Sequence, residues 1–238
     1  MRCCNKMKNI EYTKMAFLYD KFYMKKDYLK EVTFLKRFIR DNDYKILDAG
    51  CGSGNHSKIL NDLGFDIEGF DISCEMVEIA KNKVEGNFFV SDLLEVKLEQ
   101  KYDLIISFFA VFNHLKNYKE FEKSLFNLKK GLNEKGTIII DLHNPQKNGK
   151  KIDKVDNATR IMKWKKCNLL NREYSKITYI VDGIKYKTAH KFKIYKIEKL
   201  RKIAIKLGFN NVVFCENYTL DKEANEKSKN IQMIVSIS

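Results

Sequence analysis

The stretch DAGCGSGNH, residues 48–56, decides the fold of this chain. It follows a short apolar segment, KILDAG at 45–50, and precedes a segment with a helical pattern from about Asn55 to Leu63. Its glycines let the backbone turn tightly and approach a ligand without obstruction by Cβ atoms. A glycine-rich turn between a strand and a helix is typical of α/β proteins that bind a cofactor at the end of the strand.

Two details of this turn discriminate between cofactors. The dinucleotide pattern G-x-G-x-x-G requires a small residue at position 55, which is Asn55 here. Asp48, at the end of the strand, would repel a pyrophosphate but suits a cationic amino-acid group. S-adenosylmethionine carries an ammonium and a sulfonium and no phosphate. The electrostatics therefore favour this cofactor, and a nicotinamide-dependent oxidoreductase is disfavoured.

Strands and helices are expected to alternate from residue 44 to residue 145. The predicted strands are 45–50, 66–71, 87–92, 102–109 and 136–143, and the predicted helices are 55–63, 74–84 and 118–131. Ser73 is the expected N-cap of the helix at 74–84. Apolar strands separated by amphipathic helices indicate a parallel sheet with helices on both faces.

The pattern changes after residue 146. Period-two alternation predicts three strands, at 159–170, 172–183 and 184–195, with a hairpin turn at Val181-Asp182-Gly183. A helix at 197–209 and strands at 210–216 and 230–238 follow. The expected fold is α/β, a doubly wound, seven-stranded, mostly parallel sheet with an antiparallel β cap inserted after strand five.

Four parts are expected along the chain. They are an N-terminal helical lid (1–43, helical over 9–42), a cofactor-binding core (44–145), an antiparallel substrate cap (146–195), and a final helix and strands that complete the core (196–238).

Two further aspartates extend the predicted cofactor site. Asp71 ends the second strand, where an acidic residue accepts hydrogen bonds from ribose hydroxyls in such folds. Asp92 ends the third strand, where a carboxylate can accept from the adenine amino group. With Asp48, these acids all lie at the carboxyl ends of predicted parallel strands, the edge at which open α/β sheets bind ligands.

The charge of the chain is unevenly distributed. The formal net charge is +14, yet residues 1–145 carry 23 basic and 22 acidic side chains, against 22 and 9 in residues 146–238. Either the lysines form a solvated face, or the C-terminal part attracts an anionic partner, a phosphorylated metabolite or RNA. Aromatics interleave with lysines in the cap, a pattern that suits RNA stacking but that a half-buried sheet also produces.

The remaining composition suggests a cytoplasmic protein. The six cysteines include no C-x-x-C pair, so we expect no metal site and no disulfide framework. No apolar run approaches the ~18 residues of a membrane span, and the N-terminal segment lacks a secretory pattern. We expect a monomer or a homodimer.

Successive segments resemble the motifs of class I S-adenosylmethionine-dependent methyltransferases. These are KILDAGCGSG, GFDISCEMVEIAKNK, VSDLLE, YDLIISFFAVFNHL and LNEKGTIIIDLH, and the resemblance covers roughly residues 15–145. The later part resembles the small-molecule branch, which includes N-methyltransferases of nucleotide-linked amino sugars and, more distantly, glycine N-methyltransferases. The resemblance implies a Rossmann-like fold with S-adenosylmethionine as cofactor and S-adenosylhomocysteine as product.

The resemblance also implies roles for particular residues. Asp48, Gly50, Cys51 and Gly52 would hold the methionyl end, and Asp71 and Ile72 the ribose, with Met76 nearby. Ser91, Asp92 and Leu93 would meet the adenine, and Phe108 would face the methionyl group. Tyr19, Tyr23 and Tyr28 match an N-terminal segment that closes over the cofactor in this family.

Methyl transfer needs a base only when the nucleophile arrives protonated. The predicted catalytic residues are His143 at the end of the fifth strand, Asn113 after the fourth strand, and Tyr19 as an orienting hydroxyl. Asn144, His114, His190 and His56 are the other candidates on the same edge or in the cap, and each is more simply explained as a hydrogen-bonded or exposed side chain.

The leading hypothesis is an enzyme that methylates an N or O atom of a small, anionic metabolite, for example a nucleotide-linked sugar. Two alternatives stay open. One is an RNA methyltransferase that uses the basic C-terminal region, and the other is a non-catalytic protein that binds S-adenosylmethionine. The absence of a D/N-P-P-Y/F/W motif after the fourth strand argues against methylation of exocyclic base nitrogens.

Overall fold

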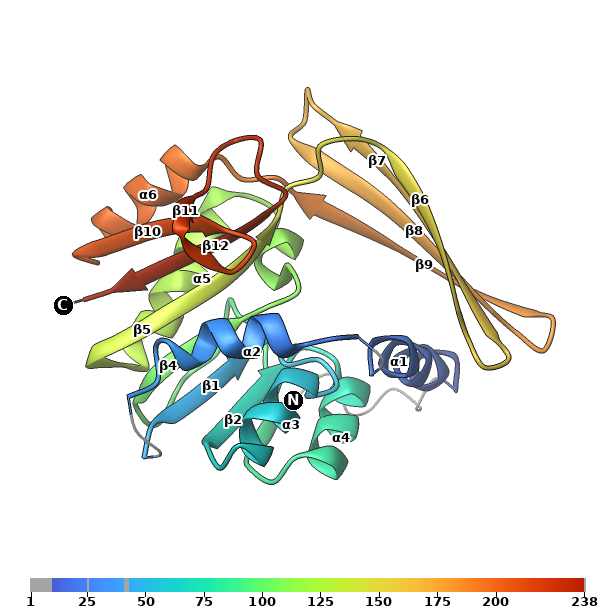
Figure 1. Ribbon diagram of the computed structural model, residues 1–238, viewed down its shortest axis with the longest axis horizontal. Coiled ribbons are helices and arrows are strands. Elements are labelled where there is room, and N and C mark those ends of the chain that lie inside the picture. The colour runs from blue at the N-terminus through green and yellow to red at the C-terminus, as the bar shows by residue number, and fades with distance from the viewer. Residues whose placement is uncertain (1–9, 25, 41–42, 238) are drawn as a thin grey trace.

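A central sheet of eight strands forms the core of the molecule (Figure 1). The computed structural model describes residues 10–24, 26–40 and 43–237. Five strands are parallel: β1 (Lys45–Ala49), β2 (Asp66–Asp71), β3 (Phe88–Val90), β4 (Tyr102–Ser107) and β5 (Leu132–His143). The strand order is β11-β10-β12-β5-β4-β1-β2-β3, so the chain starts in the middle of the sheet and winds outward in both directions.

Three antiparallel strands complete one edge of this sheet. These are β10 (Asn211–Glu216), β11 (Thr219–Glu223) and β12 (Asn230–Ser236), with β12 inserted between β5 and β10. The sequence predicts seven strands, and the additional one is β11. It is a short, polar edge strand that follows a tight turn in which Asn217 and Tyr218 have positive φ. Its sequence, TLDKE, carries no apolar alternation to reveal it.

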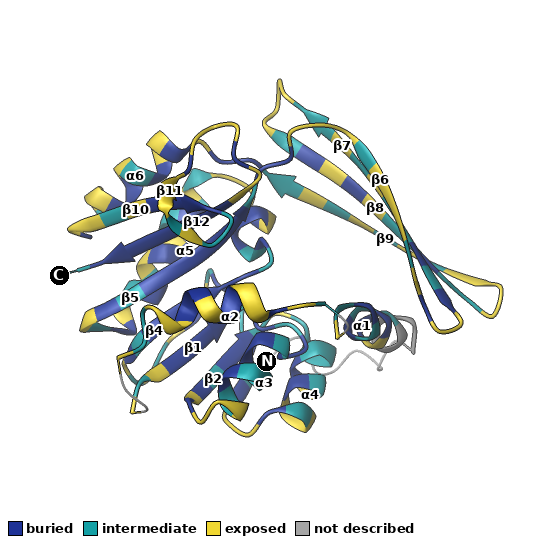
Figure 2. Ribbon diagram, viewed as in Figure 1, coloured by how far each residue is buried: buried dark blue, intermediate teal, exposed yellow. Residues whose placement is uncertain are grey.

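Helices cover both faces of the central sheet, as the alternation predicts. On one face lie α2 (Leu29–Lys36), α3 (Asn55–Asp62) and α4 (Cys74–Lys83), and on the other α5 (Tyr118–Lys130) and α6 (Ile197–Lys206). In β4, Leu104 and Ile106 pack on the face that α2, α3 and α4 cover, and Ile105 packs on the face that α5 and α6 cover. Successive side chains of a strand point to opposite faces. Figure 2 shows the resulting buried strands in dark blue.

A second sheet stands beside the core. It is antiparallel, in the order β6-β7-β8-β9, with β6 (Gly149–Val155), β7 (Ala158–Cys167), β8 (Arg172–Val181) and β9 (Ile184–Lys193). The predicted turn between β8 and β9 is confirmed, with Asp182 and Gly183 both at positive φ. The sequence predicts three strands here and misses β6, GKKIDKV, because lysines dominate it and only its last residue is buried.

The N-terminal segment forms two helices rather than one, α1 (Ile10–Tyr23) and α2. Helix α1 lies against α4 and β6, between the central sheet and the antiparallel sheet (Figure 1). Asp20 accepts hydrogen bonds from Ser53 of the glycine turn and from Lys83, each at 2.6 Å. On its other side, Phe22 packs on Tyr179 of β8 with ring centroids 5.7 Å apart. Helix α1 therefore connects the glycine turn with the antiparallel sheet.

Candidate active site

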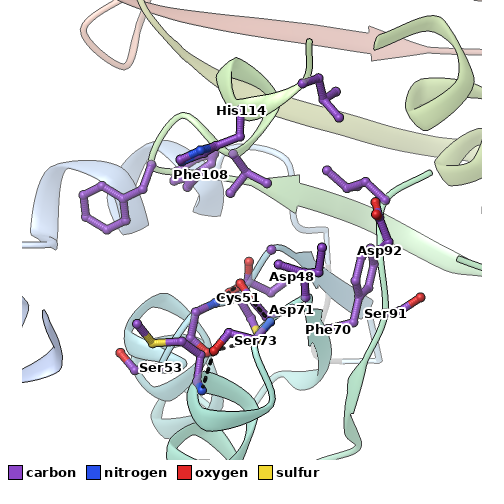
Figure 3. A pocket seen from close by; sticks show the side chains of 18 of the residues that line it. Asp48, Cys51, Ser53, Phe70, Asp71, Ser73, Ser91, Asp92, Phe108 and His114 are labelled. Atoms are coloured by element: carbon purple, nitrogen blue, oxygen red, sulfur yellow. Dashed lines mark hydrogen bonds between the residues drawn. The ribbon is translucent and has the colours of Figure 1, made fainter. Parts of the chain in front are cut away.

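A cavity of about 560 Å³ lies at the carboxyl ends of β1, β2 and β4 (Figure 3). Residues from α1, from the short helix η1 (Val111–His114) and from β9 complete its walls. Most of the predicted cofactor residues line it: Tyr19, Asp48, Gly50, Cys51, Gly52, Asp71, Ile72, Met76, Ser91, Asp92, Leu93 and Phe108. Residues more than 70 positions apart in the sequence are thus brought to one site.

The glycine turn is shaped to receive a ligand. Gly50, Gly52 and Gly54 have φ values of 84°, 54° and 75°, which disfavour any residue with a side chain. A Cβ at Gly50 would lie 2.6 Å from a methyl group of Val111, whereas a Cβ at Gly52 would meet nothing within 4 Å. Gly50 is therefore required for packing, and Gly52 leaves open space in the wall of the cavity.

Asp48 is a buried acid with no cationic partner among the described residues. Only 2% of its surface is exposed, and Ser57 donates a hydrogen bond of 2.7 Å to Oδ2. Burial raises the pKa of this carboxyl to about 7, because the hydrogen bond offsets only part of the desolvation. A cation placed in the cavity would favour the ionised form, so the site fits the ammonium of S-adenosylmethionine.

Asp71 is held in a fixed position at the end of β2. Its Oδ2 accepts from the backbone N–H of Gly52 at 3.0 Å and its Oδ1 from that of Ser73 at 2.9 Å. Burial raises the pKa of Asp71, and these backbone donors partly oppose the shift. Each carboxylate oxygen retains a lone pair, so Asp71 can accept hydrogen bonds from a ribose diol. Ser73 caps α4 as predicted, with Oγ accepting from the backbone N–H of Met76.

Ser91 and Asp92 lie at one end of the cavity, beside Phe70 (Figure 3). Asp92 Oδ1 accepts from the backbone N–H of Leu94 at 2.9 Å, which fixes the turn after β3. A flat apolar wall beside a carboxylate and a hydroxyl is suited to a purine ring with an exocyclic amine.

Two histidines lie in the wall at the opposite end. His114 ends η1 and His190 lies on β9, and their ring centroids are 5.5 Å apart. Enclosure of His114 lowers its pKa to about 4, with a smaller contribution from the charge of His190. Burial also lowers the pKa of His190. Both rings are therefore neutral near pH 7 and can accept a hydrogen bond or a proton.

A third histidine, His56, lies deeper in the wall. Its ring packs edge-on against Tyr28 and Phe108, at 4.9 and 5.1 Å. Burial lowers the pKa of His56 to about 3. Its Nε2 atom is buried without a hydrogen-bond partner among the described residues, which leaves a polar atom for a ligand in the cavity.

Two predicted catalytic residues do not line the cavity. The Asn113 side chain donates to the carbonyls of His143 and Lys193 and accepts from the backbone N–H of His143, at 2.7–3.0 Å. His143 Nε2 lies 3.1 Å from Glu173 of β8. These bonds join the end of β5 to η1 and β9. The position of both residues at strand ends suggested chemistry, whereas their side chains hold the two sheets together.

Tyr19 and Tyr28 behave differently from each other. Tyr19 lines the cavity, and burial raises its pKa well above the ordinary value. Tyr28 does not line it, because its hydroxyl donates to the carbonyl of Tyr23 at 3.0 Å and its ring supports His56 from behind.

Several lining residues were not predicted for the site. They include Ser53, Asn55, Phe109, Val111, Leu115, Lys116 and Glu120. Apart from the two beside the glycines, they follow β4, where the sequence predicts only Phe108, Asn113 and His114 as candidate residues.

A family model described as a methyltransferase domain matches residues 19–213. The chain belongs to this methyltransferase family. With its glycine turn and strand-end acids, it is a Rossmann-like, S-adenosylmethionine-dependent methyltransferase.

Individual proteins are similar to this chain in sequence or in fold. An uncharacterised protein of Methanocaldococcus jannaschii is 34% identical over 229 residues, which are 89% of this chain and 81% of that protein. A dTDP-3-amino-3,4,6-trideoxy-alpha-D-glucopyranose N,N-dimethyltransferase of Streptomyces venezuelae is 24% identical over 132 residues, 53% of this chain and 56% of that protein. The crystal structure of an S-adenosylmethionine-dependent methyltransferase from Clostridium acetobutylicum shares the fold, with a TM-score of 0.80, 22% identity, and coverage of 95% and 99% of the two chains.

Among the described residues, no helix is both long and apolar enough to cross a membrane.

Proposed function

We propose that this enzyme methylates an N or O atom of a small metabolite, and that the amino group of a nucleotide-linked sugar is the acceptor. The observation that carries the proposal is the cavity itself. It runs from buried acids at one end to two neutral histidines at the other, and β9 of the antiparallel sheet closes it. The similarity to an amino-sugar N,N-dimethyltransferase supports the same class of acceptor.

The acids support the placement of the cofactor at one end of the cavity. Asp48 would pair with the ammonium, Asp71 with the ribose hydroxyls, and Ser91 and Asp92 with the adenine. Gly52 leaves the space in which the methionyl group can approach the backbone. S-adenosylmethionine supplies a methyl group on a sulfonium, which is already activated for in-line displacement. The protein's contribution is alignment and exclusion of water.

His114 and His190 support the placement of the acceptor at the other end. They take the place of His143 and Asn113 in the proposal. We assign the base to His114, because its ring lies in the cavity wall opposite Asp48 and Asp71 (Figure 3). An imidazole nitrogen of His114 would accept a hydrogen bond from the acceptor and take its proton as the methyl group transfers. Burial, with a smaller contribution from His190 5.5 Å away, keeps the pKa of His114 low, so the ring stays available as an acceptor.

Basic side chains beside the histidines would hold an anionic substituent. Lys116 lines the cavity, and Arg172 donates to the Lys116 carbonyl at 2.8 Å. Burial and the charges of Arg172 and Lys199 lower the pKa of Lys193. A diphosphate placed here would relieve this repulsion. The described cysteines form no disulfide, which fits the cytoplasmic location that we propose.

An acceptor screen tests the proposal. Release of S-adenosylhomocysteine is measured with a nucleotide-linked amino sugar, with its hydroxyl analogue and with the free amino sugar. We expect turnover of the nucleotide-linked amine. In Arg172→Ala, we expect KM to rise for the linked acceptor but not for the free sugar. Turnover of none of the three by an enzyme that binds S-adenosylmethionine would contradict this acceptor class.

A further inference from the structure

The antiparallel sheet has two chemically different faces. Arg160, Tyr179 and Tyr186 lie opposite one another on three neighbouring strands, so they share one face. This inner face contacts α1, where the Arg160 guanidinium lies 4.8 Å from the ring centroid of Phe22. His190, on the same face, lines the cavity. The alternate residues of β6–β9 therefore form an outer face that is turned away from the cavity.

Within β6–β9, every charged side chain on the outer face is basic. The inner face carries Asp153 and Glu173 as well as basic residues. Two outer residues are engaged in hydrogen bonds, since Arg172 donates to the carbonyl of Lys116 in the core and Lys193 to that of Leu170 in the turn between β7 and β8. The others are all exposed, and we call them the outer lysine face: Lys150, Lys154, Lys163, Lys165, Lys176, Lys185, Lys187 and Lys191.

Three of these lysines form a row across the sheet. Lys150 pairs with Lys163, and Lys163 pairs with Lys176, so like charges stand directly opposite each other on three strands. Like charges directly opposite each other destabilise a sheet. No acidic residue of β6–β9 lies on this face to offset the repulsion. A bound polyanion would offset it.

The shape of this face argues for one kind of polyanion. A hollow of about 630 Å³ lies in its middle, with Ile161, Thr178 and Ile180 in its wall and lysines around them. A hollowed face rimmed by lysines fits a cylindrical polyanion better than a flat bilayer. A second copy of the same face would add to the repulsion, because a symmetric contact places like charges together.

The dimensions agree with a nucleic acid helix. Ten-residue strands such as β7, β8 and β9 span roughly 33 Å. Over that length a double helix presents about 20 phosphates, of which about half face one side. We propose that the outer lysine face binds the phosphate backbone of a nucleic acid duplex without reading its sequence. This surface is independent of the cavity, so binding needs no methylation of the nucleic acid.

The test compares two variants of equal net charge. One is Lys150→Glu/Lys163→Glu/Lys176→Glu in the row of opposed lysines. The other is the control Lys97→Glu/Lys123→Glu/Lys135→Glu, which changes exposed lysines elsewhere. Fluorescence anisotropy measures their affinity for 20-base-pair RNA and DNA duplexes from 50 to 200 mM salt. Calorimetry with S-adenosylmethionine verifies that both variants keep the fold and the cofactor site.

For the wild type we expect micromolar binding at 50 mM salt, with a slope of log K against log salt of about −4. The row variant should bind about 30-fold more weakly, with the slope reduced by about 3, and the control should stay within about threefold of wild type. RNA and DNA arms identify which duplex is preferred. Equal losses of affinity in both variants would show that only the net charge of the protein matters, and would overturn the proposal. Binding to phosphatidylserine vesicles but to neither duplex would also overturn it.

Discussion

The two ends of the cavity are built in different ways. At the proposed cofactor end, Asp48 and Asp71 lie at the ends of adjacent strands, and backbone or hydroxyl groups hold their carboxylates in place. At the acceptor end, His114 and His190 come from η1 and β9, which meet only because the antiparallel sheet docks beside the core. The first end is fixed by local chain geometry, and the second by how two sheets pack. Mutations at the first end should therefore change cofactor affinity, and mutations at the second should change turnover.

The largest expected effect is at the acceptor end. His114→Ala should lower kcat by about 10²–10³-fold, as expected for loss of a general base, and leave the affinity for S-adenosylmethionine unchanged. Single-turnover assays and calorimetry measure the two quantities. His143→Ala is the matched control, because its imidazole bonds to Glu173 outside the cavity. Equal losses of kcat in both variants would contradict the assignment to His114, and a loss confined to the His143 variant would return the base to His143.

At the cofactor end, Asp71→Ala should weaken S-adenosylmethionine binding by about 100-fold. It removes two hydrogen bonds to a charged acceptor, and at about 1.5 kcal/mol each, the lower end for such bonds, the loss is about 3 kcal/mol. Titration calorimetry gives the dissociation constant. Asp66→Ala, at the exposed start of the same strand, is the control and should bind like wild type. An Asp71 variant with wild-type affinity would remove the ribose contact from the proposal.

The pH dependence of cofactor affinity should be smaller, about tenfold. Asp48 binds a cation only when ionised, and its pKa in the free protein is about 7. Affinity should therefore rise from pH 6 to pH 7.5 and then level off. Above about pH 8 it should fall as the ligand's own ammonium loses its proton. Asp48→Asn should bind weakly with little dependence on pH below 7.5, and a steep rise in that variant would assign the titration to another group.

The smallest effect is expected at Tyr28, which supports the cavity wall but does not line the cavity. Tyr28→Phe removes one hydrogen bond to the Tyr23 carbonyl and should lower the free energy of unfolding by about 1 kcal/mol. Cofactor affinity and kcat should not change. Chemical denaturation measures the loss, and Tyr19→Phe, which alters the lining, serves for comparison. A large fall in affinity for the Tyr28 variant would place its hydroxyl in the site.

The gathering of the glycine turn and the strand-end acids in one cavity could be predicted from sequence because its signals are local. Gly50 and Gly52 share one turn with Asp48, and Asp71 ends a strand whose bounds are predicted correctly. At the proposed acceptor end, His114 and His190 are only secondary candidates from sequence, because nothing near them shows that β9 contacts η1. His143 is predicted from its place at the end of the fifth strand and Asn113 from its place after the fourth, and position alone does not show that both side chains lie outside the cavity.

The secondary structure was predicted well in the buried core and less well at the exposed sheet edges. The core strands were predicted because burial on both faces requires continuous apolar runs. Strands β6 and β11 were missed because each is an edge strand whose side chains are mostly exposed, so its residues need not alternate.

With the proposed pairing between Asp48 and the cofactor's ammonium, the buried carboxyl would link cofactor supply to the lifetime of the protein. An acid that is costly to bury in the empty enzyme becomes favourable once a cation lies beside it, so occupancy changes stability as well as activity. A ligand at 100 times its dissociation constant stabilises a folded protein by about 2.7 kcal/mol. A cell short of S-adenosylmethionine would then hold less of this enzyme, because proteases act on the unfolded fraction, which grows as the cofactor is depleted.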